Sequence, residues 1–172
     1  MEPPRLPYAD LSPPETAALA EKIAAQRGSV LDLYRMLLHS PPMAEGWLQF
    51  LTAVRQKGLL PGRLREMTII RVGILNGASY EAAQHAPIAL REGMSQAQLD
   101  ALADWPSSDR FDERERAILA YTDAMTREIQ VPDAVFASVR QTLDERSLVE
   151  LTITIATYNM VSRFLEALRI HA

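Results

Sequence analysis

The sequence predicts an all-α protein that folds as a helical bundle, and three observations support that prediction. Apolar residues recur at intervals of three and four residues in nearly every segment between turn signals. Helix-start patterns such as Ser12-Pro13-Pro14-Glu15 and Ser95-Gln96-Ala97-Gln98 precede several of these segments. Seven glycines and an aromatic content of 6% argue against an all-β design. The 172 residues are enough for one ordinary domain with a full core.

The first part of the chain is expected to form an extended arm and three helices. Residues 1–11 are rich in proline, which is typical of an extended segment. The first helix begins after Ser12, tolerates proline in its first turn and is closed by Gly28. The three predicted helices cover residues 12–27, 29–39 and 41–57, and Gly58 ends the third.

A fourth and a fifth helix are expected between residues 60 and 93. Residues 60–77 contain many β-branched side chains, so a strand is conceivable, but the length and the apolar spacing favour a helix. Ser79 is the predicted N-cap of the fifth helix, which ends at Gly93. Pro87 lies inside that helix, and we expect it to bend or shorten the helix.

The rest of the chain predicts four more helices and one clear loop, residues 104–112. Asp144 is the expected cap of the last helix, which is apolar nearly all round between residues 148 and 168. Other helices or a neighbouring subunit must therefore enclose it. We expect a single all-helical domain over residues 12–172. The four predicted helices cover residues 95–102, 113–128, 131–141 and 145–170.

Composition and charge exclude several classes of function. The net charge is −4, only two lysines occur, and no cluster of Lys and Arg forms the basic surface that nucleic-acid binding needs. The absence of cysteine excludes a disulfide, a thiolate zinc site and a thiol nucleophile. Residues 1–15 lack the apolar region of a signal peptide, and the uncharged run 151–162 is too short for a bilayer, which needs about 20 residues. We expect a soluble, cytoplasmic protein that binds neither nucleic acid nor membrane.

Glu66 is the first candidate for acid–base chemistry. It lies in the strongly apolar fourth helix and shares a face with Ile69, Ile70 and Gly73. If these neighbours desolvate the carboxyl group, its pKa rises, which suits a general acid or base near neutral pH. Gly73 allows another backbone or a small ligand to approach closely. The alternative is that Glu66 is simply solvated at the rim of that face.

Glu81 and His85 are the second candidate, an i, i+4 pair on the fifth helix. If Glu81 holds one ring nitrogen of His85, the other nitrogen is left to move a proton. The alternative is an ordinary surface ion pair that contributes little to stability.

Two further residues are candidates for binding a substrate. Tyr80 offers a hydroxyl group at the mouth of such a site. Arg71 is a candidate anchor for a carboxylate, although Arg63 or Arg163 would serve as well.

The region that contains these residues resembles the carboxymuconolactone decarboxylase family, which includes alkyl hydroperoxidase D-like proteins. The resemblance rests on residues 65–95, REMTIIRVGILNGASYEAAQHAPIALREGMS, in which an Arg-Glu pair, an apolar run, Asn, Tyr-Glu, His and Gly follow in order. Residues 39–66 and 156–170 resemble the longer members, so the likeness covers the chain from about His39 onward. It implies an alkyl hydroperoxidase D-like fold and a ring-like homo-oligomer, a trimer or hexamer.

The resemblance also bears on chemistry. In the thiol-dependent branch, a Glu is followed after eleven residues by Cys-x-x-Cys and, three residues later, by a His; Glu66 and His85 match these two ends. Ala78 and Glu81 stand at the two cysteine positions, so peroxidase activity of that branch is disfavoured. The decarboxylase branch also lacks the cysteine pair, and for it the resemblance implies acid–base work on a carboxylated lactone without metal or organic cofactor.

We therefore expect a cofactor-free acid–base enzyme that acts on a small carboxylate or lactone by decarboxylation or proton transfer. Glu66, Glu81 and His85 are its expected catalytic residues, with Tyr80 and Arg71 in substrate binding. The alternative is a family member without catalysis that serves as a ligand-binding or scaffolding oligomer.

Overall fold

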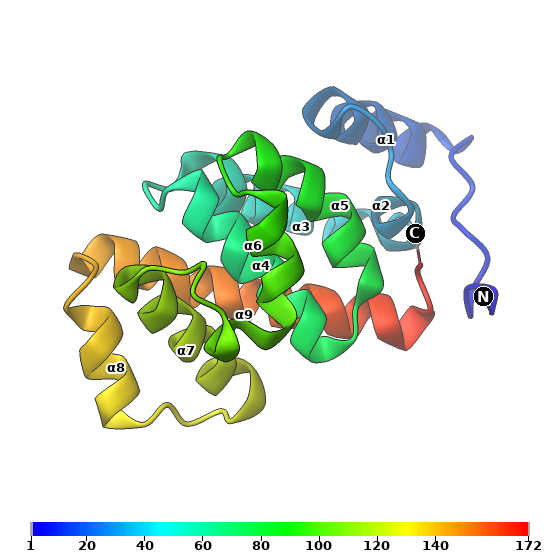
Figure 1. Cartoon of the computed structure of the whole chain (residues 1–172). Coiled ribbons are helices and arrows are strands. Elements are labelled where there is room, and N and C mark those ends of the chain that lie inside the picture. The colour runs from blue at the N-terminus through cyan, green and yellow to red at the C-terminus, as the bar shows by residue number, and fades with distance from the viewer. Residues whose placement is uncertain (1, 172) are drawn as a thin grey trace. The chain divides into compact units, whose positions relative to one another are not determined.

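The computed structural model describes residues 2–171 and confirms the all-α prediction (Figure 1). No strand occurs within these residues, and the ambiguous segment 60–77 is helical. In the same part of the chain, no helix is long and apolar enough to span a membrane. The helices are α1 (Pro14–Arg27), α2 (Asp32–Leu37), α3 (Pro41–Thr52), α4 (Gly62–Asn76), α5 (Ser79–Arg91), α6 (Gln96–Ala101), α7 (Glu113–Arg127), α8 (Asp133–Arg140) and α9 (Glu145–Leu168), with a π-helical turn η1 (Ala53–Lys57) and a 3-10 turn η2 (Leu102–Ser107).

The described residues form two compact units, and the single domain expected over residues 12–172 stays a prediction. Residues 2–57 and 167–171 form the first unit, and residues 58–166 form the second. In the first unit α3 packs against α1 and α2, and the backbone N–H of Arg5 donates to the carbonyl of Leu168 at 3.0 Å. Helical periodicity shows which face of a helix is apolar but not which neighbours cover it, so the division was not visible in the pattern.

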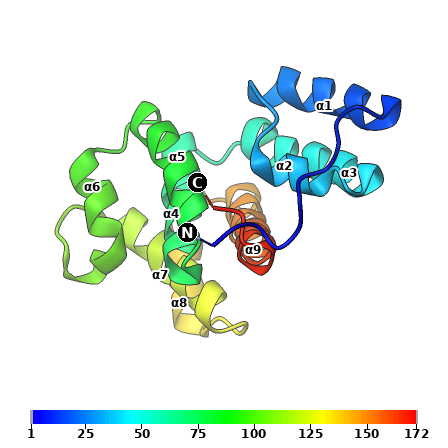
Figure 2. The same ribbon diagram turned by 90° about the vertical axis from the view of Figure 1, so that its right-hand side faces the viewer.

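The central helix of the second unit is α4, against which α5 and α7 pack. Every residue from Glu66 to Gly73 is buried. In Figure 2, α4 and α5 run upright while α9 is viewed nearly along its axis, so α9 crosses the pair. Because α4 is enclosed on all sides over this stretch, its polar side chains must find their partners inside the protein.

The helix boundaries agree with the predicted capping signals at some ends and not at others. Ser95 forms the predicted capping box, and Asp144 accepts a hydrogen bond from the N–H of Ser147 at 2.7 Å at the start of α9. Ser12 and Ser79 are not N-caps, because α1 and α5 each begin one residue away from the predicted position without a side-chain cap.

Two prolines lie inside helical segments. The helix α5 continues through Pro87 without interruption to Arg91. Pro106 lies within η2, so the first part of the expected loop 104–112 is a 3-10 turn. A 3-10 turn is a common continuation of a helix end, and α6 leads directly into this one.

Glu150 on α9 fixes the segment that leads into α4. Its Oε2 accepts hydrogen bonds from the backbone N–H groups of Leu59 at 2.6 Å and Leu60 at 2.7 Å, and its Oε1 accepts one from Arg146 at 3.0 Å. Burial by itself would raise the pKa of Glu150, but the hydrogen bonds from Arg146, Leu60 and Leu59 together outweigh it and hold the pKa below its usual value.

Replacing Glu150 by Gln is expected to lower the free energy of unfolding at neutral pH by about 1–2 kcal/mol, because hydrogen bonds to a charged acceptor are lost. A carboxyl group whose pKa is lowered by folding stabilises the protein above its unfolded-state pKa, and this stabilisation is lost as the pH falls through the folded-state pKa. Urea unfolding should therefore show wild type and Glu150→Gln converging in acid.

The control for this experiment is Glu21→Gln, at an exposed position on α1. It should change the free energy of unfolding little at either pH. A Glu150→Gln deficit of the same size in acid as at neutral pH would contradict the assigned role of the carboxylate.

Candidate functional site

Three buried ionisable side chains from α4 and α5 meet in the second unit. His85 Nδ1 lies 2.6 Å from Glu66 Oε2, and His85 Nε2 lies 3.4 Å from Glu81 Oε2. Glu66, Glu81 and His85 are 1%, 3% and 4% exposed, so these groups face one another and not the solvent. We call Glu66, Glu81 and His85 the acid–base trio.

Two glycines allow the helices of the trio to approach closely. Gly77 ends α4 with a φ of +69°, a conformation that residues with a side chain rarely adopt, and α5 begins two residues later. At Gly73 an added Cβ would lie 3.0 Å from the Cβ of Glu81, closer than normal packing allows. This close packing brings α5 near enough for Glu66, two turns before Gly73, to reach His85.

The ring of His85 is oriented by Glu66. The sequence suggested Glu81 for this task, because residues four apart on a helix are neighbours. The structure instead gives the short contact to Glu66, on the adjacent helix, and the longer one to Glu81. An ionised carboxylate accepts hydrogen bonds and cannot donate them, so Glu66 favours a proton on Nδ1 and leaves Nε2 directed toward Glu81.

Two residues to which the sequence analysis gave no role at the site also contact the trio. Arg65 Nε donates a hydrogen bond to Glu66 Oε1 at 3.1 Å. The ring of Tyr158, on α9, meets the ring of His85 edge-on, with centroids 5.1 Å apart. Arg65 stands next to Glu66 in the chain, but adjacent helical residues normally point in different directions. For Tyr158 no local pattern signals the contact.

A shallow hollow of about 210 Å³ lies beside the trio, at the turn between α4 and α5. The polar atoms of the trio do not line it, but Ala78 and Ala82 precede Glu81 and His85 by one turn each, on the same side of α5. The N-terminus of α5, which has no side-chain cap, lies at the hollow and favours a negatively charged group there. The hollow is lined by Gly73, Ile74, Gly77, Ala78, Ser79 and Ala82.

Arg71, the predicted carboxylate anchor, pairs with groups inside the protein. Its Nε and Nη2 donate to the two carboxylate oxygens of Asp123 at 2.7 and 2.6 Å. Its Nη1 donates to the carbonyls of Leu102 and Ala103 at 2.8 and 3.0 Å. Arg71 is buried and all three of its nitrogens are engaged, so it joins α4 to α7 and η2, and we do not assign it to a substrate.

The other predicted substrate-binding groups also lie apart from the hollow. Tyr80 is buried and does not line it. Arg63 pairs with Glu115 at 2.6 Å, and Arg163 donates to the carbonyl of Asn159 on its own helix at 3.0 Å. Among residues 2–171, no three His, Asp or Glu side chains are arranged to hold a metal ion.

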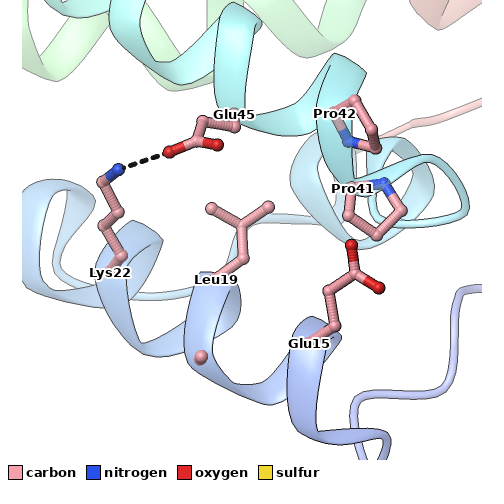
Figure 3. A pocket seen from close by; sticks show the side chains of 7 residues that line it. Glu15, Leu19, Lys22, Pro41, Pro42 and Glu45 are labelled. Atoms are coloured by element: carbon pink, nitrogen blue, oxygen red, sulfur yellow. Dashed lines mark hydrogen bonds and ion pairs between the residues drawn. The ribbon is translucent and has the colours of Figure 1, made fainter.

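The first unit contains a larger cleft, of about 400 Å³, between α1 and α3 (Figure 3). The ion pair between Lys22 Nζ and Glu45 Oε1, at 2.8 Å, bridges the two helices at one end of it. None of its lining residues is buried, and the trio belongs to the other unit. We therefore place the candidate site at the trio. The cleft is lined by Glu15, Ala18, Leu19, Lys22, Pro41, Pro42 and Glu45.

Comparison with known proteins links the region of the trio to one family. Residues 41–124 match the model of the carboxymuconolactone decarboxylase family, and this range includes the whole of α4 and α5. The uncharacterized protein YdfG of Bacillus subtilis (strain 168) is 29% identical over 101 residues, which are 58% of this chain and 69% of that protein.

Solved structures share the fold. An uncharacterized peroxidase-related protein from Ralstonia eutropha JMP134, described as an alkylhydroperoxidase AhpD core, matches with a TM-score of 0.84 at 18% identity, over 99% of this chain and 93% of that chain. The debrominase Bmp8 matches with a TM-score of 0.79 at 18% identity, over 95% of this chain and 88% of that chain. Such likeness establishes the alkyl hydroperoxidase D-like fold and does not establish an activity.

Replacing Arg71 by Met is expected to lower the free energy of unfolding by about 3 kcal/mol, because Asp123 then loses its buried partner. Arg127→Met is the matched control, since the exposed Arg127 guanidinium lies 3.9 Å from the same carboxylate. Its loss should cost less than about 1 kcal/mol. Urea unfolding measures both effects, and equal losses for the two variants would rule out the structural role assigned to Arg71.

Proposed function

We propose that this chain, a member of the carboxymuconolactone decarboxylase family, is a cofactor-free acid–base enzyme that acts on a small carboxylated compound by decarboxylation or proton transfer. The acid–base trio is the observation that supports the proposal. A histidine held at Nδ1 by a buried carboxylate is oriented to exchange a proton at Nε2, and Glu81 lies 3.4 Å from that atom. Buried, interacting ionisable groups of this kind cluster at functional sites.

The hollow at the turn between α4 and α5 is the proposed substrate site. A substrate carboxylate would be stabilised there by the N-terminus of α5. Since the polar atoms of the trio do not line the hollow, contact with Nε2 requires the first turn of α5 to move. The predicted part of Tyr80 in substrate binding belongs to the same proposal, and it requires the same movement because Tyr80 is buried and does not line the hollow.

In decarboxylation the trio supplies a proton to the substrate carbon that loses CO₂. When the bond to CO₂ breaks, its electron pair stays on the substrate carbon as an enolate-like charge. Protonated His85 supplies the proton for the new C–H bond and becomes neutral. Glu66 stabilises the imidazolium before the transfer, and Glu81 is placed to return a proton to Nε2. In the proton-transfer variant, the same atoms move a proton between two positions of the substrate.

A second candidate function is ligand binding or scaffolding without catalysis. It is favoured by the enclosure of the trio, because a substrate in the hollow as observed would not touch the ionisable groups. Peroxide reduction is disfavoured, because the chain has no cysteine to attack the peroxide. One structural neighbour is named an uncharacterized peroxidase-related protein and another a debrominase, so the shared fold alone does not select an activity.

Self-association as a trimer or hexamer is part of the proposal. Val149, Ile153 and Met160 lie along one side of α9, and each is at least 40% exposed. Apolar side chains repeated along one helix face favour burial against another surface. The cytoplasmic location expected from the sequence stays a prediction.

Replacing His85 or Glu66 by Gln is expected to reduce turnover by at least about 100-fold, because general acid–base catalysis contributes that much or more. A thermal-shift screen of dicarboxylates and lactones identifies compounds that bind, and CO₂ release or proton exchange with solvent then reports turnover. Circular dichroism confirms that the variants fold.

His39→Gln, at an exposed position in the first unit, is the control for that experiment and should keep full activity. Full activity of His85→Gln would remove His85 from the mechanism. Tight binding with no turnover by wild type would favour the non-catalytic alternative.

Replacing Ile153 by Glu is expected to shift the mass measured by light scattering toward the monomer, because a charge would then have to be buried in the contact. Ile129→Glu is the matched control, since Ile129 is 99% exposed and lies outside α9. A wild-type protein that is monomeric at micromolar concentration would contradict self-association.

A further inference from the structure

We propose that Arg65 is the positioning residue of the acid–base trio, because its guanidinium fixes the Glu66 carboxylate and thereby sets how tightly His85 holds its proton. The inference rests on the proposed function, since it concerns the same site. Arg65 acts through Glu66, and no contact between Arg65 and a substrate is invoked.

The contacts of Glu66 divide its two oxygens between two partners. Oε1 accepts the hydrogen bond from Arg65 Nε at 3.1 Å, and Oε2 makes the 2.6 Å contact with His85 Nδ1. A carboxylate held at both oxygens cannot rotate away from the imidazole without breaking a buried hydrogen bond. The side chain of Arg65 is only 14% exposed, so solvent screens its charge weakly.

Arg65 is itself held from the other side. Glu92, directly after α5, places Oε1 3.9 Å from Arg65 Nη2. The carboxylate of Glu92 also lies against the first residue of α4, since a Cβ added at Gly62 would clash with Glu92 Oε2. The start of α4 and the end of α5 are thus joined where Arg65 is positioned, and Gly62 is the residue that leaves room for the contact.

The charges around His85 give this arrangement an electrostatic consequence. The imidazole faces Glu66 from α4, Glu81 from its own helix and the Tyr158 ring from α9. Arg65 places a positive charge against Glu66, with Arg65 Nε 3.1 Å from Glu66 Oε1. Removing its positive charge would leave two buried carboxylates to attract the same proton. The coupled group of Glu66 and His85 would then release its proton only at higher pH.

Arg63, on the same helix, provides a comparison because it forms an ion pair outside the trio. Arg63 donates to Glu115 at 2.6 Å and also to the carbonyl of Gly93. It is part-buried, like Arg65, but its partner is not in the trio. Loss of Arg63 should therefore reduce stability without altering the proton affinity at His85.

The test is an NMR titration of the histidine rings in the full chain, with wild type, Arg65→Gln, Arg65→Lys and Arg63→Gln. The ring nitrogen shifts of His85 report its protonation and tautomer directly, and the exposed His39 serves as an internal reference. For Arg65→Gln the midpoint of the His85 titration should rise by about 1 pH unit, because the coupled Glu66–His85 pair loses a nearby positive charge. Arg65→Lys keeps the positive charge, so its midpoint should stay close to the wild-type value. Arg63→Gln should leave the midpoint at its wild-type value.

An unchanged or lowered midpoint in Arg65→Gln would overturn the inference, and so would an equal rise in Arg63→Gln. If Arg65→Gln does not fold, Arg65→Met replaces it, because methionine fills similar space without the charge, and the same rise of the midpoint is expected. Glu92→Gln should leave the midpoint within a few tenths of a pH unit because Arg65 keeps its charge, and a large shift would contradict the assignment of the effect to Arg65. Turnover plays no part in this readout, so the inference and the proposed function can fail independently.

Discussion

The hydrogen bond between Glu66 and His85 is the contact on which the candidate site depends. It joins two consecutive helices at a point that is closed to water, where neither group has solvent as a substitute partner. Gly73 makes the necessary approach of the helices possible, and Gly77 makes the turn between them. The same requirement explains Arg71, whose buried guanidinium is satisfied by Asp123 from another helix. The buried polar side chains of α4 thus contribute to its packing against α5 and α7.

Helical spacing and capping signals were sufficient to predict the fold class and the positions of α4 and α5, because both depend on residues close together in the chain. The meeting of Glu66 with His85 required the family resemblance, since spacing alone relates residues only within one helix. The contact of Arg65 with Glu66 and the pairing of Arg71 with Asp123 could not be predicted, because both depend on tertiary packing and not on residue type. The division after Lys57 was hidden for the same reason.

Members of the thiol-dependent branch of the carboxymuconolactone decarboxylase family carry two cysteines before the histidine. Ala78 and Glu81 stand at the positions that the cysteines occupy there, and His85 keeps its place. In the structure the Glu81 carboxylate lies beside the imidazole. A carboxylate can take up or release a proton but cannot form a disulfide, so the exchange retains a titratable partner for the histidine while removing the capacity to pass electrons.

Pro87 removes one backbone hydrogen bond from α5, two residues after His85. Proline has no N–H to donate, so the carbonyl of Ala83, four residues earlier, is released from the helical ladder. Both Pro87 and Ala83 are exposed, and the freed carbonyl can be hydrated without entering the core. The missing hydrogen bond therefore lies on the exposed side of α5, and the buried side that carries His85 and Ala89 keeps its packing.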